Sequence, residues 1–137
     1  MSFKILCKKI ISLLTKRGKK SVARKLLLTV FQNIRRNGLD PFFVFIIAVR
    51  NAMPLVTLTT FKKSGQTVYM PKILSQERRL SLALRTLVQV AGRQHDKKKT
   101  PFCDCLVSVL LDTFKRTGGA YERRQELHSS ADNHRTF

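Results

Sequence analysis

The fold of this chain is decided by the stretch PLVTLTTFKKSGQTVYMP, residues 54–71. Residues 55–61 and 67–70 are rich in β-branched and aromatic side chains, whereas the segment between them is polar and contains a glycine. This pattern predicts two strands and a turn, because branched side chains favour strands and glycine accepts the backbone of a tight turn. The expected hairpin arm covers residues 55–71, and its tip consists of Lys62, Lys63, Ser64, Gly65 and Gln66. A basic tip of this kind is expected to touch a partner.

Three helices are expected before the arm, because apolar residues recur there at helical spacing. The first covers residues 3–16, and the second is expected to start at Ser21 as its cap and to end at Gly38. Asp40-Pro41 marks the start of the third, since aspartate accepts free amide bonds and proline presets the first helical residue. Residues 42–49 are apolar all round, so this helix is expected to be the most buried.

Two further helices are expected directly after the arm. Ser75 is expected to cap a helix that runs to about Arg93, and a basic loop over residues 96–99 should follow it. Thr100-Pro101 repeats the pattern of a cap and a first-turn proline, and a fifth apolar stripe follows.

A glycine pair is expected to break the chain before the last helix. Gly118-Gly119 is this break, and a short polar helix should begin near Tyr121. The predicted fold is therefore mainly α: a six-helix body with one protruding β-hairpin arm inserted between the third and fourth helices. A length of 137 residues favours a single domain over residues 1–137.

The charge is strongly unbalanced. The chain has 27 Lys and Arg against 8 Asp and Glu, a formal net charge of +19. The expected binding partner is therefore a polyanion, which would neutralise this charge. Hydrophobic residues make up 43%, which is too much for a disordered basic tail. Charge alone leaves nucleic acid, a membrane surface and an acidic protein open as partners. No membrane insertion is expected, because the longest apolar run, residues 41–49, is far shorter than the ~20 residues of a spanning helix.

The first 39 residues contain eleven Lys or Arg and no acidic residue. Transit peptides share this balance, so a cleaved targeting segment is one interpretation. The stretch is Lys-rich rather than Arg-rich and passes directly into good helical patterns. We therefore expect it to be part of the fold.

The residues that carry chemistry are few. Three cysteines, Cys7, Cys103 and Cys105, do not form a disulfide framework, and this favours a reducing compartment. Cys103 and Cys105 diverge by about 200° on a helix and lack a second cysteine pair, so no metal is expected. The histidines have no helical metal spacing, and no nucleophile stands beside a base. We expect no enzyme activity, no cofactor and no small-molecule substrate.

Basic clusters recur at the ends of the expected elements. They are Lys16-Arg17-Gly18-Lys19-Lys20, Arg35-Arg36, Lys62-Lys63, Arg78-Arg79, Lys97-Lys98-Lys99, Lys115-Arg116 and Arg123-Arg124. Any one of them could be a solvated surface. Because few acidic residues compensate them, the clusters together favour a folded RNA-binding protein. Its affinity is expected to come from the release of counterions, and it is expected to recognise the shape of the RNA.

Several motifs follow one another in the order seen in a known family. They are Gly18-Lys19-Lys20-Ser21, Asp40-Pro41, Asn51-Ala52-Met53-Pro54, Arg78-Arg79 with the helix after it, Leu110-Leu111-Asp112, and Arg123-Arg124-Gln125-Glu126-Leu127-His128. In this order they resemble the small-subunit ribosomal protein family numbered seven, over nearly the whole chain. The resemblance implies a primary binder of small-subunit ribosomal RNA that organises the head domain. It also implies an arm near the exit tRNA site and the mRNA path, and neighbouring head-domain ribosomal proteins as partners.

The resemblance and the basic clusters together predict the RNA-binding residues. The resemblance implies RNA backbone contacts for Lys19, Lys20, Arg78, Arg79, Arg85, Arg123 and Arg124. The clusters add Lys16, Arg17, Arg35, Arg36, Lys115 and Arg116.

The chain departs from the family pattern at identifiable places. The arm has Lys-Lys-Ser-Gly-Gln where a double-arginine, double-glycine turn is usual, and Thr86 stands where tryptophan is common. With the Phe-rich, Trp-free composition, these departures predict a divergent organellar member in a mitochondrial ribosome. A plastid ribosome and the bacterial cytoplasm are the alternatives. Two other functions stay open: a basic membrane-surface protein, suggested by the acid-free first helix, and a DNA-binding helical module.

Overall fold

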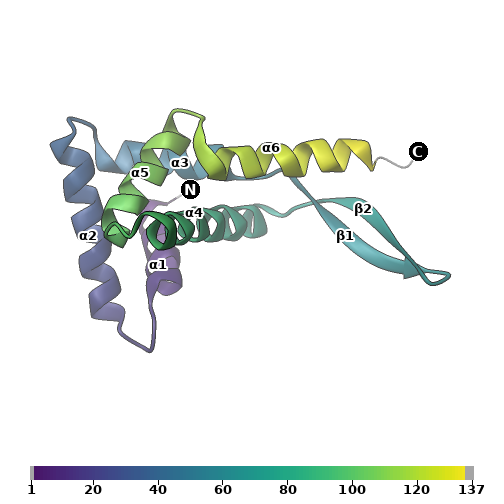
Figure 1. Cartoon of the computed structure of the whole chain (residues 1–137), viewed down its shortest axis with the longest axis horizontal. Coiled ribbons are helices and arrows are strands. Elements are labelled where there is room, and N and C mark those ends of the chain that lie inside the picture. Colours follow the sequence, from purple (N-terminus) through teal and green to yellow (C-terminus); the bar gives the residue numbers. More distant parts are fainter. Residues whose placement is uncertain (1, 135–137) are drawn as a thin grey trace.

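The computed structural model describes residues 2–134, and it confirms the mainly α architecture with the hairpin between the third and fourth helices (Figure 1). The elements in chain order are α1 (Phe3–Leu14), α2 (Lys20–Arg36), α3 (Pro41–Ala52), β1 (Val56–Lys63), β2 (Gln66–Ile73), α4 (Gln76–Lys98), α5 (Phe102–Phe114) and α6 (Gly118–Asn133). Figure 1 shows the body helices at one end of the molecule, and the arm projects from them beside α6.

One apolar core unites the helices, and α5 lies within it against α2, α3, α4 and α6. Leu106 and Leu110 of α5 are fully buried. Phe45 of α3 is also fully buried, and its ring centroid lies 5.6 Å from that of Phe31 and 6.0 Å from that of Phe3. The core therefore joins the two ends of the chain.

The N-terminal segment contributes to this core. Leu6 and Ile10 of α1 are fully buried, as expected for a segment that is part of the fold. Within residues 2–134, no helix is long and apolar enough to cross a membrane.

The third helix starts as predicted and has the largest buried share of the described helices, with six of its 12 residues buried against six of 13 in α5. The Phe42 N–H donates to Asp40 Oδ1 at 3.1 Å, so Asp40 caps the helix. Phe42 and Phe43, however, are 45% and 56% exposed. These two rings lie at the edge of the buried face, where Phe42 packs against Phe3 of α1 and Phe43 against Phe114 of α5.

Two of the predicted caps are also wrong. Helix α2 begins at Lys20 with Lys19 in the cap position, and no side chain caps it, so Ser21 lies inside the first turn. Thr100 does not cap α5 either, since its hydroxyl lies 2.9 Å from Cys105 Sγ. Ser21 lies two residues after the cap position of α2, and Thr100 lies one residue before that of α5, so neither hydroxyl is placed to accept from the free amides.

Helices α4 and α6 are longer than predicted. Helix α4 continues through Gly92 and the expected basic loop to Lys98, and it ends where the left-handed residue Lys99 donates its N–H to His95 O. Burial of Leu87 and Ala91 on the inner face outweighs the helix penalty of Gly92. Helix α6 starts at Gly118. There Gly118 takes a φ of 84°, which glycine adopts without strain, so the glycine pair begins the helix rather than preceding it.

The arm is a regular two-stranded ladder whose register runs from Val56 opposite Ile73 to Lys63 opposite Gln66. The two turn residues, Ser64 and Gly65, have φ values of 53° and 79°, as a tight turn of primed type requires. The arm thus extends two residues beyond the predicted end at residue 71. Helix α6 packs against both strands, and the Tyr69 and His134 rings lie 5.5 Å apart.

Candidate nucleic-acid interface

The arm leaves the body through three residues, Met53, Pro54 and Leu55, which we call the arm root. Arg79 of α4 donates from Nε to the Pro54 carbonyl at 3.1 Å. Arg124 of α6 donates from Nε to the Met53 carbonyl at 3.0 Å. These bonds connect the arm root to two helices that are distant in the sequence.

The third bond at the arm root involves His128 of α6. The Leu55 N–H donates to His128 Nε2 at 3.0 Å, so this ring nitrogen must carry no proton. Burial lowers the pKa of His128, the Arg124 and Arg79 guanidinium groups lower it further, and the Asp132 carboxylate opposes them. The surroundings therefore favour the neutral ring that accepts the bond.

Arg79, Arg124 and His128 together form what we call the root clamp. Arg79 and Arg124 were predicted to hold RNA backbone, but both are half-buried and use Nε inside the protein. Sequence reasoning missed the role of His128. The only signal for it is the i, i+4 spacing of Arg124 and His128, which places both on one face of α6.

The cluster between α1 and α2 consists of exposed cations. Lys16, Arg17, Lys19 and Lys20 are all exposed, and Lys16 and Lys19 line a hollow shared with α4 and α5. Arg17 takes a φ of 55° and Gly18 one of 73°, so the loop turns sharply and holds the cations close to the start of α2.

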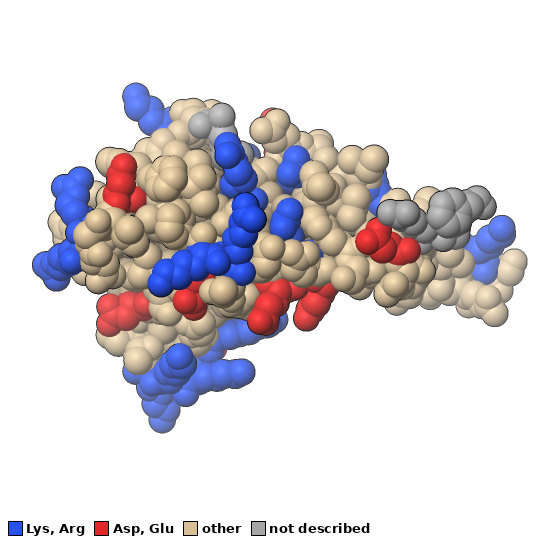
Figure 2. Space-filling model, turned by 90° about the horizontal axis from the view of Figure 1, so that it is seen from above, with Lys and Arg blue, Asp and Glu red and all other residues tan. Residues whose placement is uncertain are grey.

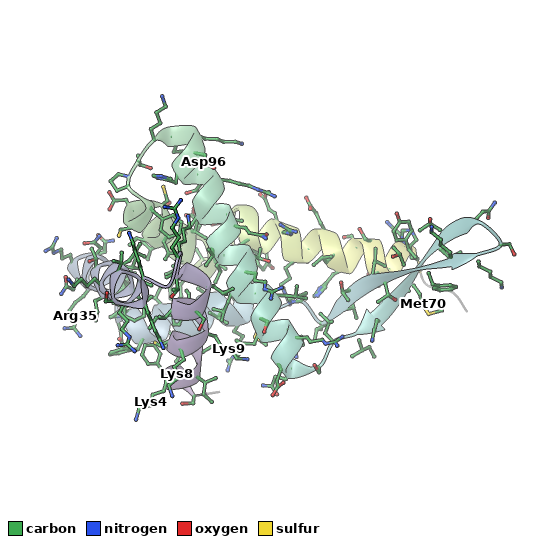
Figure 3. All side chains as sticks on the ribbon, turned by 90° about the horizontal axis from the view of Figure 1, so that it is seen from below. Lys4, Lys8, Lys9, Arg35, Met70 and Asp96 are labelled. Carbon is green, nitrogen blue, oxygen red and sulfur yellow. The ribbon has the colours of Figure 1, made fainter. Side chains whose placement is uncertain are left out.

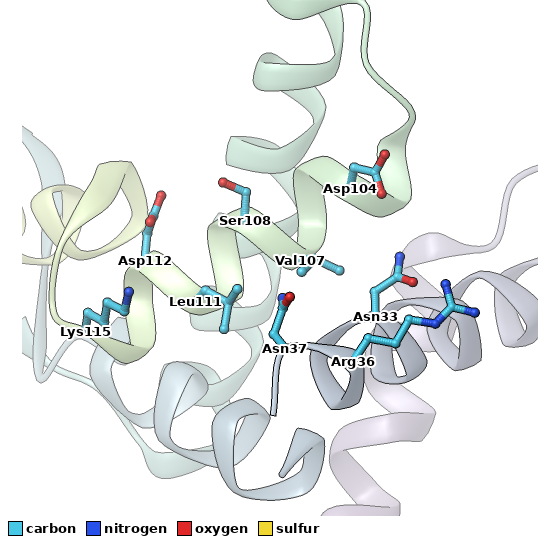
Figure 4. A pocket seen from close by; sticks show the side chains of 9 residues that line it. All are labelled: Asn33, Arg36, Asn37, Asp104, Val107, Ser108, Leu111, Asp112 and Lys115. Carbon is cyan, nitrogen blue, oxygen red and sulfur yellow. The ribbon is translucent and has the colours of Figure 1, made fainter. Parts of the chain in front are cut away.

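A second group of predicted residues lies at the junction of α2 and α5. Arg36 and Lys115 line one hollow of about 510 Å³, and Figure 4 shows them at opposite ends of it. Asp104 and Asp112 line the same hollow. Their carboxylates would repel a phosphate deep inside, so Arg36 and its exposed neighbour Arg35 suit contacts at the rim. Arg116 is also exposed, but it lines another hollow, whose other lining residues belong mostly to α6.

Arg123 belongs to a third group, which sequence reasoning identified only in part. Arg93 and Lys97 of α4 and Arg123 of α6 line one hollow of about 560 Å³, together with Glu122 and Glu126. Arg123 Nη1 also donates to Gln89 Oε1 at 3.2 Å. Arg93 was not predicted as a site residue, although its i, i+4 spacing with Lys97 places both on one face of α4.

The remaining predicted residues lie on α4 and at the arm tip. Arg78 and Arg85 are exposed on α4, and Lys62, Lys63, Ser64, Gly65 and Gln66 are all exposed at the tip. Figure 2 shows Lys and Arg gathered over the broad helical end and again near the end of the arm, with acidic side chains among them. Figure 3 shows Lys4 and Lys8 projecting from α1 at the rim of the body, while Met70 lies out on the arm. The cations thus form several separate groups rather than one patch.

The cysteines show no sign of ligand chemistry. Burial raises the pKa of Cys7, and burial followed by the Asp104 carboxylate raises that of Cys103, so both thiols favour the protonated form. Among residues 2–134, no group of three or more His, Cys, Asp or Glu side chains is placed to hold a metal ion.

The chain matches known proteins along most of its length. The family model for ribosomal protein S7p/S5e matches residues 2–135. The small ribosomal subunit protein uS7c of Paulinella chromatophora is 36% identical over 130 residues, which cover 93% of this chain and 81% of that protein. The small ribosomal subunit protein uS7 of Caldicellulosiruptor saccharolyticus is 34% identical over 121 residues, 88% of this chain and 76% of the relative. That of Dictyoglomus turgidum is 34% identical over 134 residues, 97% and 84% of the two chains.

The family match extends over the helical body and the arm alike. The bacterial relatives share about a third of their residues with this chain in alignments that cover most of both partners. The chain therefore belongs to the ribosomal protein S7p/S5e family and is a structural protein of the small ribosomal subunit.

Proposed function

We propose that residues 1–137 act as a single RNA-binding domain that holds small-subunit ribosomal RNA and organises the head of the subunit. The observation that carries this proposal is the set of exposed cations at the ends of rigidly packed helices and at the arm tip. Such a scaffold meets several phosphates of one folded RNA at once, and the release of counterions supplies the affinity. The role is structural rather than enzymatic.

The residues divide into two roles in this proposal. Residues that contact phosphate directly are Lys16, Arg17, Lys19, Lys20, Arg35, Arg36, Arg78, Arg85, Lys115, Arg116 and Arg123. Arg79 and Arg124 position the arm through Nε, which leaves their terminal guanidinium nitrogens for RNA. The arm tip, residues 62–66, is proposed to lie near the exit tRNA and the mRNA path.

Neighbouring head-domain proteins are the other proposed partners, and exposed Phe42 and Phe43 offer apolar surface to them.

The proposed location is a mitochondrial ribosome, which the altered arm turn and Thr86 support. The relatives described above come from bacteria and Paulinella chromatophora, so a plastid or bacterial ribosome is the alternative. Co-purification of the chain with small subunits from fractionated source cells decides between these locations.

The first test of the function is sedimentation with small subunits at low salt. The chain should co-migrate with them, and a chain that stays at the top of the gradient contradicts the proposal.

The second test compares Arg78→Glu with Arg79→Glu in binding to a transcript of small-subunit ribosomal RNA. Arg78→Glu should lower the slope of log affinity against log salt by about one and leave the arm root unchanged. Arg79→Glu, in contrast, also removes the hydrogen bond from Arg79 to the Pro54 carbonyl of the arm root. An unchanged slope contradicts the role of Arg78.

The membrane-surface alternative receives no support from α1. Its apolar face places Leu6 and Ile10 in the core, so these side chains are not available to lipid. Liposome flotation checks this: the protein should remain in the dense fraction with neutral vesicles. If it floats, and if deletion of residues 2–18 abolishes flotation, the membrane alternative replaces the proposal.

A further inference from the structure

An apolar hollow of about 340 Å³ lies between the end of α1, the start of α2, α4 and the start of α5. Leu14, Leu26, Val88 and Phe102 supply apolar walls, and all four are half-buried. A hollow of this size falls in the range of ligand pockets, roughly 300–1,000 Å³. The RNA-binding function proposed above uses Lys16 and Lys19 at its edge but not its apolar interior.

Gly92 is the unusual residue of this hollow. It lies inside α4, where glycine destabilises a helix relative to alanine, and its φ is not in the positive region that would require glycine. Apart from its chain neighbours and the backbone of its own helix, a Cβ added at this position would meet nothing within 4 Å. Neither the backbone conformation nor the packing requires glycine here, and the missing side chain leaves the hollow open up to the backbone of α4.

The mouth of the hollow is cationic. Lys16 and Lys19 line it and are both exposed, with Arg17 and Lys20 beside them. Several adjacent cations match the repeated charges of a polynucleotide better than the single charge of a fatty acid. At the edge of the hollow, the half-buried Phe102 ring lies 6.3 Å from the exposed His95 ring at an angle of 80°, and a hydrogen bond with the Thr100 carbonyl orients His95.

We propose that this hollow receives one unstacked base of single-stranded RNA, with its flat face against Phe102 and the backbone of Gly92, and its neighbouring phosphates on Lys16 and Lys19. An unstacked base combines an apolar face with flanking charges, which is the combination that this hollow offers. The inference rests on the proposed RNA-binding function and adds a recognition site for a single base to it.

The experiment uses the full chain and two hexamers, oligoadenylate and the same oligomer with its two central bases removed. Both carry the same phosphates, and fluorescence anisotropy measures their affinities. The wild type should bind the complete hexamer about tenfold more tightly, in line with stacking of one base on an aromatic ring. Gly92→Leu should fill the hollow and reduce this preference to near one. Its salt slope should stay unchanged, because no phosphate contact is lost.

Two control variants separate binding from folding. Gly92→Ala should raise the melting temperature, since alanine favours helix over glycine, and shows that the position tolerates a side chain. Gln76→Leu adds the same side chain at an exposed position at the other end of α4 and should keep the wild-type preference.

Two results would overturn the inference: a folded Gly92→Leu protein that keeps the full preference for bases, or a wild type that binds both hexamers equally. In either case the wild type would still bind the ribosomal RNA transcript. Failure of the RNA-binding function itself would instead abolish binding to that transcript, so the two failures are distinguishable.

Discussion

The helical body and the arm are built by different forces. In the body, Leu6, Phe45 and Leu106 are completely buried, so removal of apolar surface from water stabilises it. In the arm, Phe61, Tyr69, Met70 and Ile73 expose 39%, 45%, 44% and 83% of their surfaces, and a two-stranded hairpin alone is marginal in water. The direction of the arm therefore depends on α6 and on the three hydrogen bonds of the root clamp. Stability and arm orientation should be separable by mutation.

The largest effect is expected from the centre of the body. Phe45→Ala removes a fully buried ring that contacts Phe3 and Phe31, and it should lower the free energy of unfolding by about 3–5 kcal/mol. The matched change on the arm, Phe61→Ala, should cost less than about 1 kcal/mol because the ring is exposed. Urea unfolding of both variants measures the contrast. Equal losses would show that the arm contributes to the core.

The second effect is expected at the root clamp. Arg124→Leu leaves the carbonyl of buried Met53 without its donor, and this should cost about 1–2 kcal/mol. Amide exchange at Leu55 should accelerate, because the arm root loses one of its three bonds. Arg123→Leu is the control, since Arg123 is exposed and its guanidinium donates to the side chain of Gln89 rather than to the arm root. Equal exchange rates at Leu55 in the two variants would contradict the clamp.

A smaller effect is expected from pH. The pKa of His128 is lowered in the folded protein, so the unfolded chain binds more protons and the ring's contribution to stability increases with pH. This contribution is complete above the unfolded value of about 6.5 and is lost as pH falls through the lower folded value. The protection of the Leu55 amide, taken relative to its intrinsic exchange rate at each pH, should therefore fall below that point. In His128→Gln, which offers an amide oxygen that does not titrate, this pH dependence should disappear, and its persistence would assign the titration to another group.

The smallest effect on stability is expected at the arm tip. Lys62→Glu and Lys63→Glu change exposed side chains, so the free energy of unfolding should stay within about 0.5 kcal/mol of the wild type. Each change should nevertheless lower the salt slope of binding to a small-subunit RNA transcript by about one if its lysine contacts a phosphate. Filter binding over a salt series measures the slopes. Unchanged slopes for both variants would remove the tip from the RNA interface.

Part of the candidate site could be predicted because it depends on local sequence. Lys16, Arg17, Lys62 and Arg78 are exposed at element ends as their clusters indicated. The half-burial of Arg79 and Arg124 could not be predicted, because their partners are 25 and 71 residues away in the chain. A cluster of cations in the sequence shows where charge is available, but not which member the fold uses inside the protein.

The helices, the arm and the cationic character of the surface follow from local sequence patterns. The helical spacing of apolar residues acts between residues that are close in the sequence. The same is true of the helix start at Asp40-Pro41 and of the turn at Ser64-Gly65. Packing between distant segments is what carries α4 through Gly92, leaves Phe42 and Phe43 exposed, and brings His128 to Leu55 across 73 residues. Burial and long-range hydrogen bonds depend on which helix faces meet, and these faces meet only when the whole core has assembled.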